Sequence, residues 1–262
     1  MEIKATKKTQ ELVQWALDEA TKMYAGDIGN TVDEICHQLC LIPLNPMNDK
    51  TKEKVNLIVT KGLTDFTLKD ETKKIAETLF TKDFDESHSN LKLVAEMIDL
   101  VIRIAGGQWE HLGAIQRSIG KDVYFLSQED RAQLDTIKDM YFGKDYYFGI
   151  NSITLKDEIR VIYDFYKVWM FEMGVGGVYG YDVFPLSKEQ LPTVEFKPKN
   201  VWKITSEEDL DLIYASLKDK EEDENIYQDK YFKTSNYISV HPEPGDTLIQ
   251  KKNNFFKIIK AN

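Results

Sequence analysis

The stretch from Thr154 to Gly180 constrains the fold of this chain more than any other. Between positions 157 and 173 nearly every side chain is apolar or aromatic, apart from a stripe of polar residues at steps of three and four. That stripe consists of Asp157, Arg160, Asp164 and Lys167. A helix with such a narrow polar face buries most of its surface, and its charges exclude a membrane span. The pattern therefore predicts an aromatic-rich core helix around which other elements pack.

The first 150 residues predict a mainly helical region. Apolar residues recur there with helical spacing, and glycine or proline separates several of the segments. The predicted helices span 8–24, 31–40, 52–60, 68–80, 91–105, 108–119 and 127–141. Thr31 with Glu34 forms a capping-box pattern that would begin the second helix. Ser127 with Asp130 forms a cap for the last one.

After Gly180 the pattern changes to short runs that favour strands. Predicted strands span 178–184, 193–197, 200–204, 236–241, 247–250 and 255–259, with one more at 123–126. Ser206 and Asp209 cap a helix that ends near residue 217. The predicted fold class is α+β, with a helical region over 1–150 and a smaller α+β region over 151–262. Because the aromatic-rich helix is apolar enough to belong to both regions, one compact domain is the alternative.

The charge balance argues against a surface that binds nucleic acid. The net charge is −10 and it is spread evenly, with 19 basic and 25 acidic residues over 1–150 and 15 and 19 over 151–262. Neither region is a basic module that would neutralise many phosphates. The negative field favours a protein partner with a basic surface. We therefore expect protein binding and no direct nucleic-acid binding.

The N-terminal sequence and the cysteine content lead us to expect a cytoplasmic protein. MEIKATKKTQEL contains no apolar core of a signal peptide, and no run of eighteen apolar residues occurs elsewhere. Two cysteines are too few for a disulfide framework, and they suit a reducing compartment. No membrane association is expected.

Two local patterns resemble functional motifs but favour structural roles. Cys36, His37 and Cys40 lie close in sequence, but a closed zinc site needs about four ligands, and no second Cys/His pair completes it. We expect no metal there and interpret the thiols as buried on a helix face. The glycines over 174–180 have tyrosine where a dinucleotide-binding loop needs its third glycine. They are expected to end the core helix and turn the chain.

One arrangement carries chemistry that would make the chain an enzyme. Asp182 and Glu195 fall in successive predicted strands, and Lys197 follows Glu195 by two positions, on the same strand face. Over residues 156–218 this order resembles the core of PD-(D/E)xK nucleases, although Tyr181 stands where that pattern has proline. The resemblance implies that the two carboxylates hold Mg²⁺ or Mn²⁺ and that the lysine assists water attack on phosphate. Glu158 or Glu172 of the preceding helix would supply a further carboxylate.

The leading hypothesis is nevertheless a non-catalytic protein-binding factor without a cofactor. A plausible form is an acidic inhibitor, of immunity or anti-defence type, that blocks a nucleic-acid-processing partner. The candidate partner-binding residues form one acidic run, Glu221, Glu222, Asp223 and Glu224. The alternative is the metal-dependent nuclease that uses residues 182–197. Self-association through exposed aromatic residues near the core helix is a further expectation.

Overall fold

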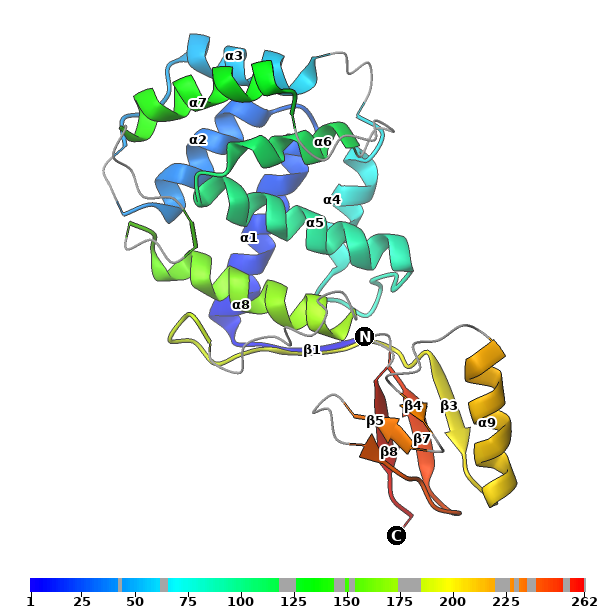
Figure 1. Ribbon diagram of the computed structural model, residues 1–262. Coiled ribbons are helices and arrows are strands. Elements are labelled where there is room, and N and C mark those ends of the chain that lie inside the picture. The colour runs from blue at the N-terminus through cyan, green and yellow to red at the C-terminus, as the bar shows by residue number, and fades with distance from the viewer. Residues whose placement is uncertain are drawn as a thin grey trace. The chain divides into compact units, whose positions relative to one another are not determined.

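The fold is α+β, as predicted, with a mainly helical N-terminal part and small antiparallel sheets (Figure 1). The computed structural model describes residues 1–41, 44–61, 66–117, 126–143, 149–150, 154–173, 185–219, 227–228, 231–234, 239–251 and 255–261. The chain divides into two units, one of residues 3–168 and 182–193, and the other of residues 1–2, 169–181 and 194–262. The division falls within the aromatic-rich helix.

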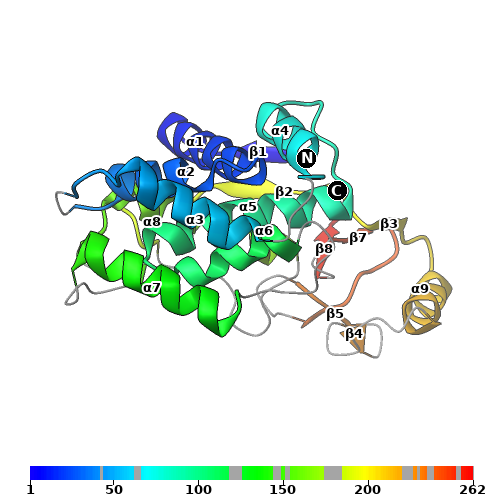
Figure 2. The same cartoon turned by 90° about the horizontal axis from the view of Figure 1, so that it is seen from above.

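Helices form most of the first unit. They are α1 Lys7–Tyr24, α2 Ile28–Leu39, α3 Asp49–Thr60, α4 Lys69–Thr78, α5 His88–Ala105, the 3-10 helix η1 Trp109–Leu112, α6 Gly113–Arg117, α7 Gln128–Phe142 and α8 Asp157–Glu172. α1 packs against α4 and α5, and α2 against α3 (Figure 2). The helices predicted from apolar spacing are present, except that the one predicted over 108–119 is divided into η1 and α6. None of the helices in the described parts of the chain has the length and apolar character that a membrane crossing requires.

The start of α2 differs from the prediction. Thr31 lies inside the helix, its hydroxyl donates to the carbonyl oxygen of Asp27, and the predicted capping box with Glu34 is wrong. The N–H groups of Ile28 and Gly29 instead donate to Asn56 Oδ1 of α3, at 2.9 and 2.7 Å. A side chain from the neighbouring helix therefore satisfies the first amide donors, which lets α2 begin earlier.

Gly29 also sets how closely α2 and α3 approach each other. A Cβ at this position would lie 2.7 Å from the carbonyl carbon of Lys52 in α3, which is closer than packed atoms allow. By contrast, the predicted cap of α7 is confirmed, because the amide of Asp130 donates to the hydroxyl oxygen of Ser127 at 3.2 Å. That cap needs only residues close in sequence.

The prediction that α8 is a buried helix is confirmed, since none of its residues is exposed. Two residues of its polar stripe, Asp164 and Lys167, are bound to partners inside the protein. Asp164 is 2% exposed, and it accepts hydrogen bonds from the amides of Leu186 and Ser187, each at 3.0 Å, and from the Ser187 hydroxyl at 2.8 Å. The ammonium of Lys167 lies 3.1 Å from the same carboxylate. These partners satisfy a carboxylate that would otherwise be costly to bury.

The described residues of the second unit form two three-stranded sheets and the helix α9. Strands β3 Asn200–Lys203, β7 Thr247–Gln250 and β8 Phe256–Ile259 form an antiparallel sheet in the order β3-β7-β8, and α9 spans Glu207–Asp219. Strands β4 Tyr227–Gln228, β5 Tyr231–Lys233 and β6 Ser239–Val240 form another sheet. A two-stranded sheet joins β1 Glu2–Lys4 to β2 Thr193–Glu195. Strands β3, β7 and β8 match predictions, whereas β1, β4 and β5 were not predicted.

The predicted strands at 123–126 and 178–184 lie largely or wholly outside the described residues. The strand predicted over 236–241 is described only at its end, as β6.

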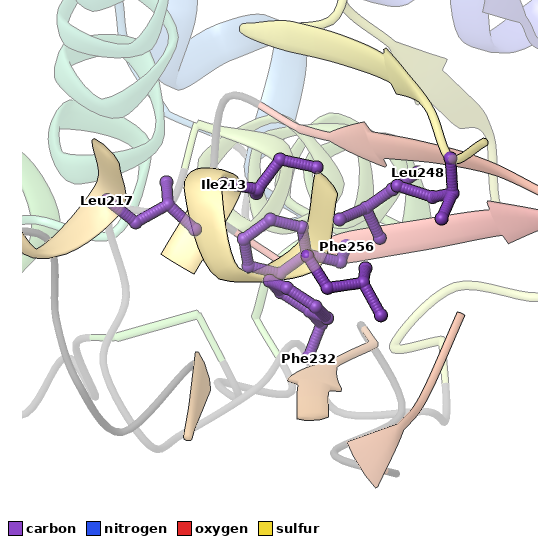
Figure 3. Packing of buried hydrophobic residues seen from close by; sticks show 7 residues of the cluster. Ile213, Leu217, Phe232, Leu248 and Phe256 are labelled. Carbon is purple, nitrogen blue, oxygen red and sulfur yellow. The ribbon is translucent and has the colours of Figure 1, made fainter. Parts of the chain in front are cut away.

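The core of the second unit lies between α9 and the β3-β7-β8 sheet (Figure 3). Ile213 and Leu217 of α9 pack with Leu248 and Phe256 of the strands. The Phe232 ring of β5 meets Phe256 edge to face, with 4.9 Å between the ring centroids. Burying these apolar side chains holds α9 flat against one face of the sheet.

Candidate interaction surface

Of the residues of the predicted nuclease site, the structure describes Glu195 and Lys197. Glu195 ends β2, while Lys197 lies two residues beyond that strand, and both side chains are exposed. Asp182 lies outside the described residues, and so does the acidic run Glu221, Glu222, Asp223 and Glu224. Within the described part of the chain β2 pairs only with β1, so Glu195 lies on a two-stranded ribbon and Lys197 lies beyond its end.

Glu172, at the C-terminal end of α8, is the carboxylate that does approach Glu195. It is 9% exposed, and the ammonium of Lys251 lies 3.3 and 3.4 Å from its two oxygens. Burial raises the pKa of Glu172, the positive charge of Lys251 opposes this rise, and the negative charge of Glu195 adds to it. The sequence offered no signal for Lys251, because 79 positions separate the two residues.

The chemistry of this cluster is that of an ion pair with a second carboxylate nearby. Trp169 and Phe196 pack next to it, with ring centroids 4.9 Å apart and planes at 84°. Among the described residues no group of three or more His, Cys, Asp or Glu side chains is arranged to hold a metal. Glu172 and Glu195 are two candidate ligands, and the nuclease interpretation adds Asp182, which lies outside the described residues.

The thiols of Cys36 and Cys40 are buried, as expected. Their exposed fractions are 0% and 3%, and neither forms a disulfide. Burial is the main cause that raises the pKa of Cys36, with the neighbouring Cys40 contributing. A buried thiol whose pKa is raised is a poor nucleophile and a poor metal ligand, which favours a structural role for Cys36.

Asp33 of α2 forms a buried polar network that the sequence analysis missed. Its carboxylate accepts hydrogen bonds from the Met47 amide at 3.0 Å and the Tyr141 hydroxyl at 2.7 Å, and lies 3.0 Å from the Lys52 ammonium. Burial raises the pKa of Asp33, but these donors outweigh it and the pKa is lowered. The network joins α2, α3 and α7, which is a structural role.

The outer face of α9 is the first of two exposed surfaces in the second unit. We define it as Glu208, Asp211, Leu212 and Ala215, all of which are exposed. Leu212 is 69% exposed, although its neighbours Leu210 and Ile213 are buried in the core. Asp209 does not belong to this face, because it accepts hydrogen bonds from the Thr205 and Ser206 amides at 2.6 and 3.0 Å and caps the helix.

The second exposed surface is the face of the β3-β7-β8 sheet that α9 does not cover. Side chains alternate along each strand, so Trp202, Leu248 and Ile258 point toward α9. The opposite face, here called the open sheet face, carries Val201, Lys203, Thr247, Ile249, Lys257 and Ile259. Val201 and Ile259 are 55% and 51% exposed.

Comparison of the chain with protein-family models, with curated proteins and with solved structures finds no match.

Proposed function

We propose that this chain is a non-catalytic protein-binding factor, and that the outer face of α9 docks a partner with a basic surface. The observation that supports this proposal is the position of Leu212, which is 69% exposed among the carboxylates of Glu208 and Asp211. In such a contact Leu212 would fill an apolar pocket of the partner, and the charges around it would select a basic surface.

The packing of α9 supports the same proposal. Its inner residues Leu210, Ile213 and Leu217 are fixed in the core, so the outer face is rigid before binding. A preorganised face loses little conformational entropy on association. The acidic run 221–224 follows α9 closely in sequence and would extend its negative field. We further propose that the partner is a nucleic-acid-processing enzyme and that the acidic surface of this chain covers its basic site. The proposal includes a cytoplasmic location, which the two free thiols suit.

The test is quantitative capture of partners by the immobilised chain. We expect a specific partner to be retained by the parent and lost with Leu212→Ser and with the double variant Glu208→Lys/Asp211→Lys. Leu57→Ser is the matched control, because Leu57 of α3 is a leucine with similar exposure, 71%. The association rate should fall at least about tenfold as salt is raised. Equal retention of the partner by the parent and both α9 variants would contradict the proposal.

A metal-dependent nuclease is the second candidate, and one observation favours it. Glu172 interacts electrostatically with Glu195, so two of the carboxylates considered for that site lie near each other. Asp182, Glu195 and Lys197 would then carry the reaction, with Mg²⁺ or Mn²⁺. Cleavage of plasmid, single-stranded DNA and RNA should be measured for the parent and for Lys197→Ala. Metal-dependent cleavage that disappears in the variant would replace the binding proposal.

A further inference from the structure

The open sheet face combines aliphatic and positively charged side chains. Three aliphatic side chains, Val201, Ile249 and Ile259, share it with Lys203 and Lys257. In the register of the sheet, Val201, Ile249 and Lys257 form one row across the strands, and Lys203, Thr247 and Ile259 form the next. The lysines therefore lie at opposite corners, with aliphatic groups between them. No residue of this face carries a carboxylate.

The chemistry of the face defines what would cover it. A matching surface needs apolar groups for the aliphatic side chains and carboxylates for the two ammonium groups. Single-stranded nucleic acid fits poorly, because its bases stack on aromatic side chains and this face has none. Trp202 lies on the opposite side of the sheet, toward α9.

The outer face of α9 has the required chemistry. Leu212 and Ala215 supply apolar contact, and Glu208 and Asp211 supply carboxylates on the same strip of helix surface, three and four residues apart. Within one chain these two surfaces cannot meet. The inner side of α9 is packed on the far face of the same sheet, so its outer face points away from the open sheet face (Figure 3).

We propose that the open sheet face of one copy binds the outer face of α9 of a second copy. Different patches meet in this contact, so each pair of copies retains one unused patch of each kind. Copies therefore add head to tail, into an open row or a closed ring, and do not stop at a dimer. Self-association of this kind does not depend on the proposed function, although it uses the same face of α9. The aromatic residues of α8 are not involved, because none of them is exposed.

The contact is small and therefore weak. Three strands of four residues give a face of about 13 Å by 14 Å, far below the roughly 1,600 Å² that a stable interface buries in total. Association should thus appear only at high protein concentration and should weaken as salt screens the charges.

The experiment measures the mass of the chain in solution against its concentration, by sedimentation velocity. For the parent, we expect the average mass to rise with concentration past that of a dimer. Two variants should each remain monomeric: Lys203→Glu/Lys257→Glu on the sheet and Glu208→Lys/Asp211→Lys on α9. An equimolar mixture of the two variants should regain association, since each then presents charges opposite to those of the other. This regain also shows that both variants are folded.

Lys50→Glu/Lys54→Glu is the matched control, because it changes the net charge equally at exposed positions of α3 and should associate like the parent. A parent that stays monomeric, or a mixture that stays monomeric while both variants are folded, overturns the proposal. Association that stops at a dimer and is lost only in the sheet variant indicates sheet-to-sheet pairing and also overturns it. The sheet variant should keep any partner docked on α9, so failure of self-association and failure of the proposed function are distinguishable.

Discussion

The ammonium of Lys251 lies 3.3 and 3.4 Å from the two carboxylate oxygens of Glu172, and it neutralises an acid that the fold buries. Burial raises the pKa of Glu172 above its ordinary value of 4.5. Compared with the unfolded chain, the native state therefore binds the Glu172 proton more tightly. The stability that this group contributes is complete below pH 4.5, and it is lost as the pH rises through the higher native pKa.

Lys251→Met should accordingly destabilise the second unit at neutral pH by about 3 kcal/mol, because it leaves a buried charge without a partner. At pH 4 the loss should be much smaller, since Glu172 is then largely protonated. Urea unfolding followed by tryptophan fluorescence at the two pH values measures both effects. Glu172→Gln/Lys251→Met is the control, and it should recover most of the stability at neutral pH. Equal losses at both pH values would contradict the assignment.

Asp33 should show the opposite pH dependence. Its lowered native pKa means that its contribution to stability is present above the ordinary value of 3.8 and is lost as the pH falls through the native value. Asp33→Ala leaves the Met47 amide, the Tyr141 hydroxyl and the Lys52 ammonium without their acceptor. We expect a loss of about 3 kcal/mol at neutral pH, measured by chemical denaturation. Tyr141→Phe removes one hydrogen bond and should cost about 1 kcal/mol.

Asn56→Ala should destabilise the helical unit through α2, although Asn56 belongs to α3. Removing the acceptor of the Ile28 and Gly29 amides should cost about 1 kcal/mol, as for the loss of a helix cap. Asn30→Ala provides the comparison, since the Asn30 side chain bonds Asp27 at an exposed position and its loss should be nearly neutral. Hydrogen exchange of the first turn of α2 should accelerate only in the Asn56 variant.

Asp246 organises the turn before β7. Its carboxylate accepts hydrogen bonds from the Lys260 ammonium at 2.8 Å, the Glu243 amide at 2.9 Å and the Ala261 amide at 3.1 Å. The bond from Lys260 is the largest cause that lowers the pKa of Asp246, to about 2. Stability from this group is present above pH 3.8 and is lost as the pH falls toward about 2. Asp246→Asn should lower the thermal unfolding midpoint at neutral pH and remove this acid-dependent loss.

The sequence predicted the features whose interacting residues lie close together along the chain, and it did not predict contacts between residues that lie far apart. Helical spacing predicted α1 and α5, and the Ser127 cap of α7 was predictable because Asp130 is three residues away. The Glu172–Lys251 pair and the Asp33–Tyr141 bond join residues that are 79 and 108 positions apart. No local pattern encodes such contacts, because tertiary packing brings the groups together.

The candidate sites also depend on tertiary contacts that no local sequence pattern encodes. Glu195 and Lys197 were identified from a triplet, yet the triplet could not show that Lys197 lies beyond the end of β2. The exposure of Leu212 was also beyond prediction, because it depends on which side of α9 meets the sheet. The assignments of Asp182 and of the acidic run 221–224 remain predictions.

The cap that Asn56 provides has a consequence for the order of folding. The first turn of α2 has no local acceptor for its amides, so it becomes stable only when α3 docks against it. The two helices should therefore form as one cooperative hairpin. In a peptide of residues 26–41 alone, the first turn should fray, and the helix should begin near Thr31, where Glu34 can complete the local capping box. The same sequence would then have one helix start in isolation and another in the folded chain.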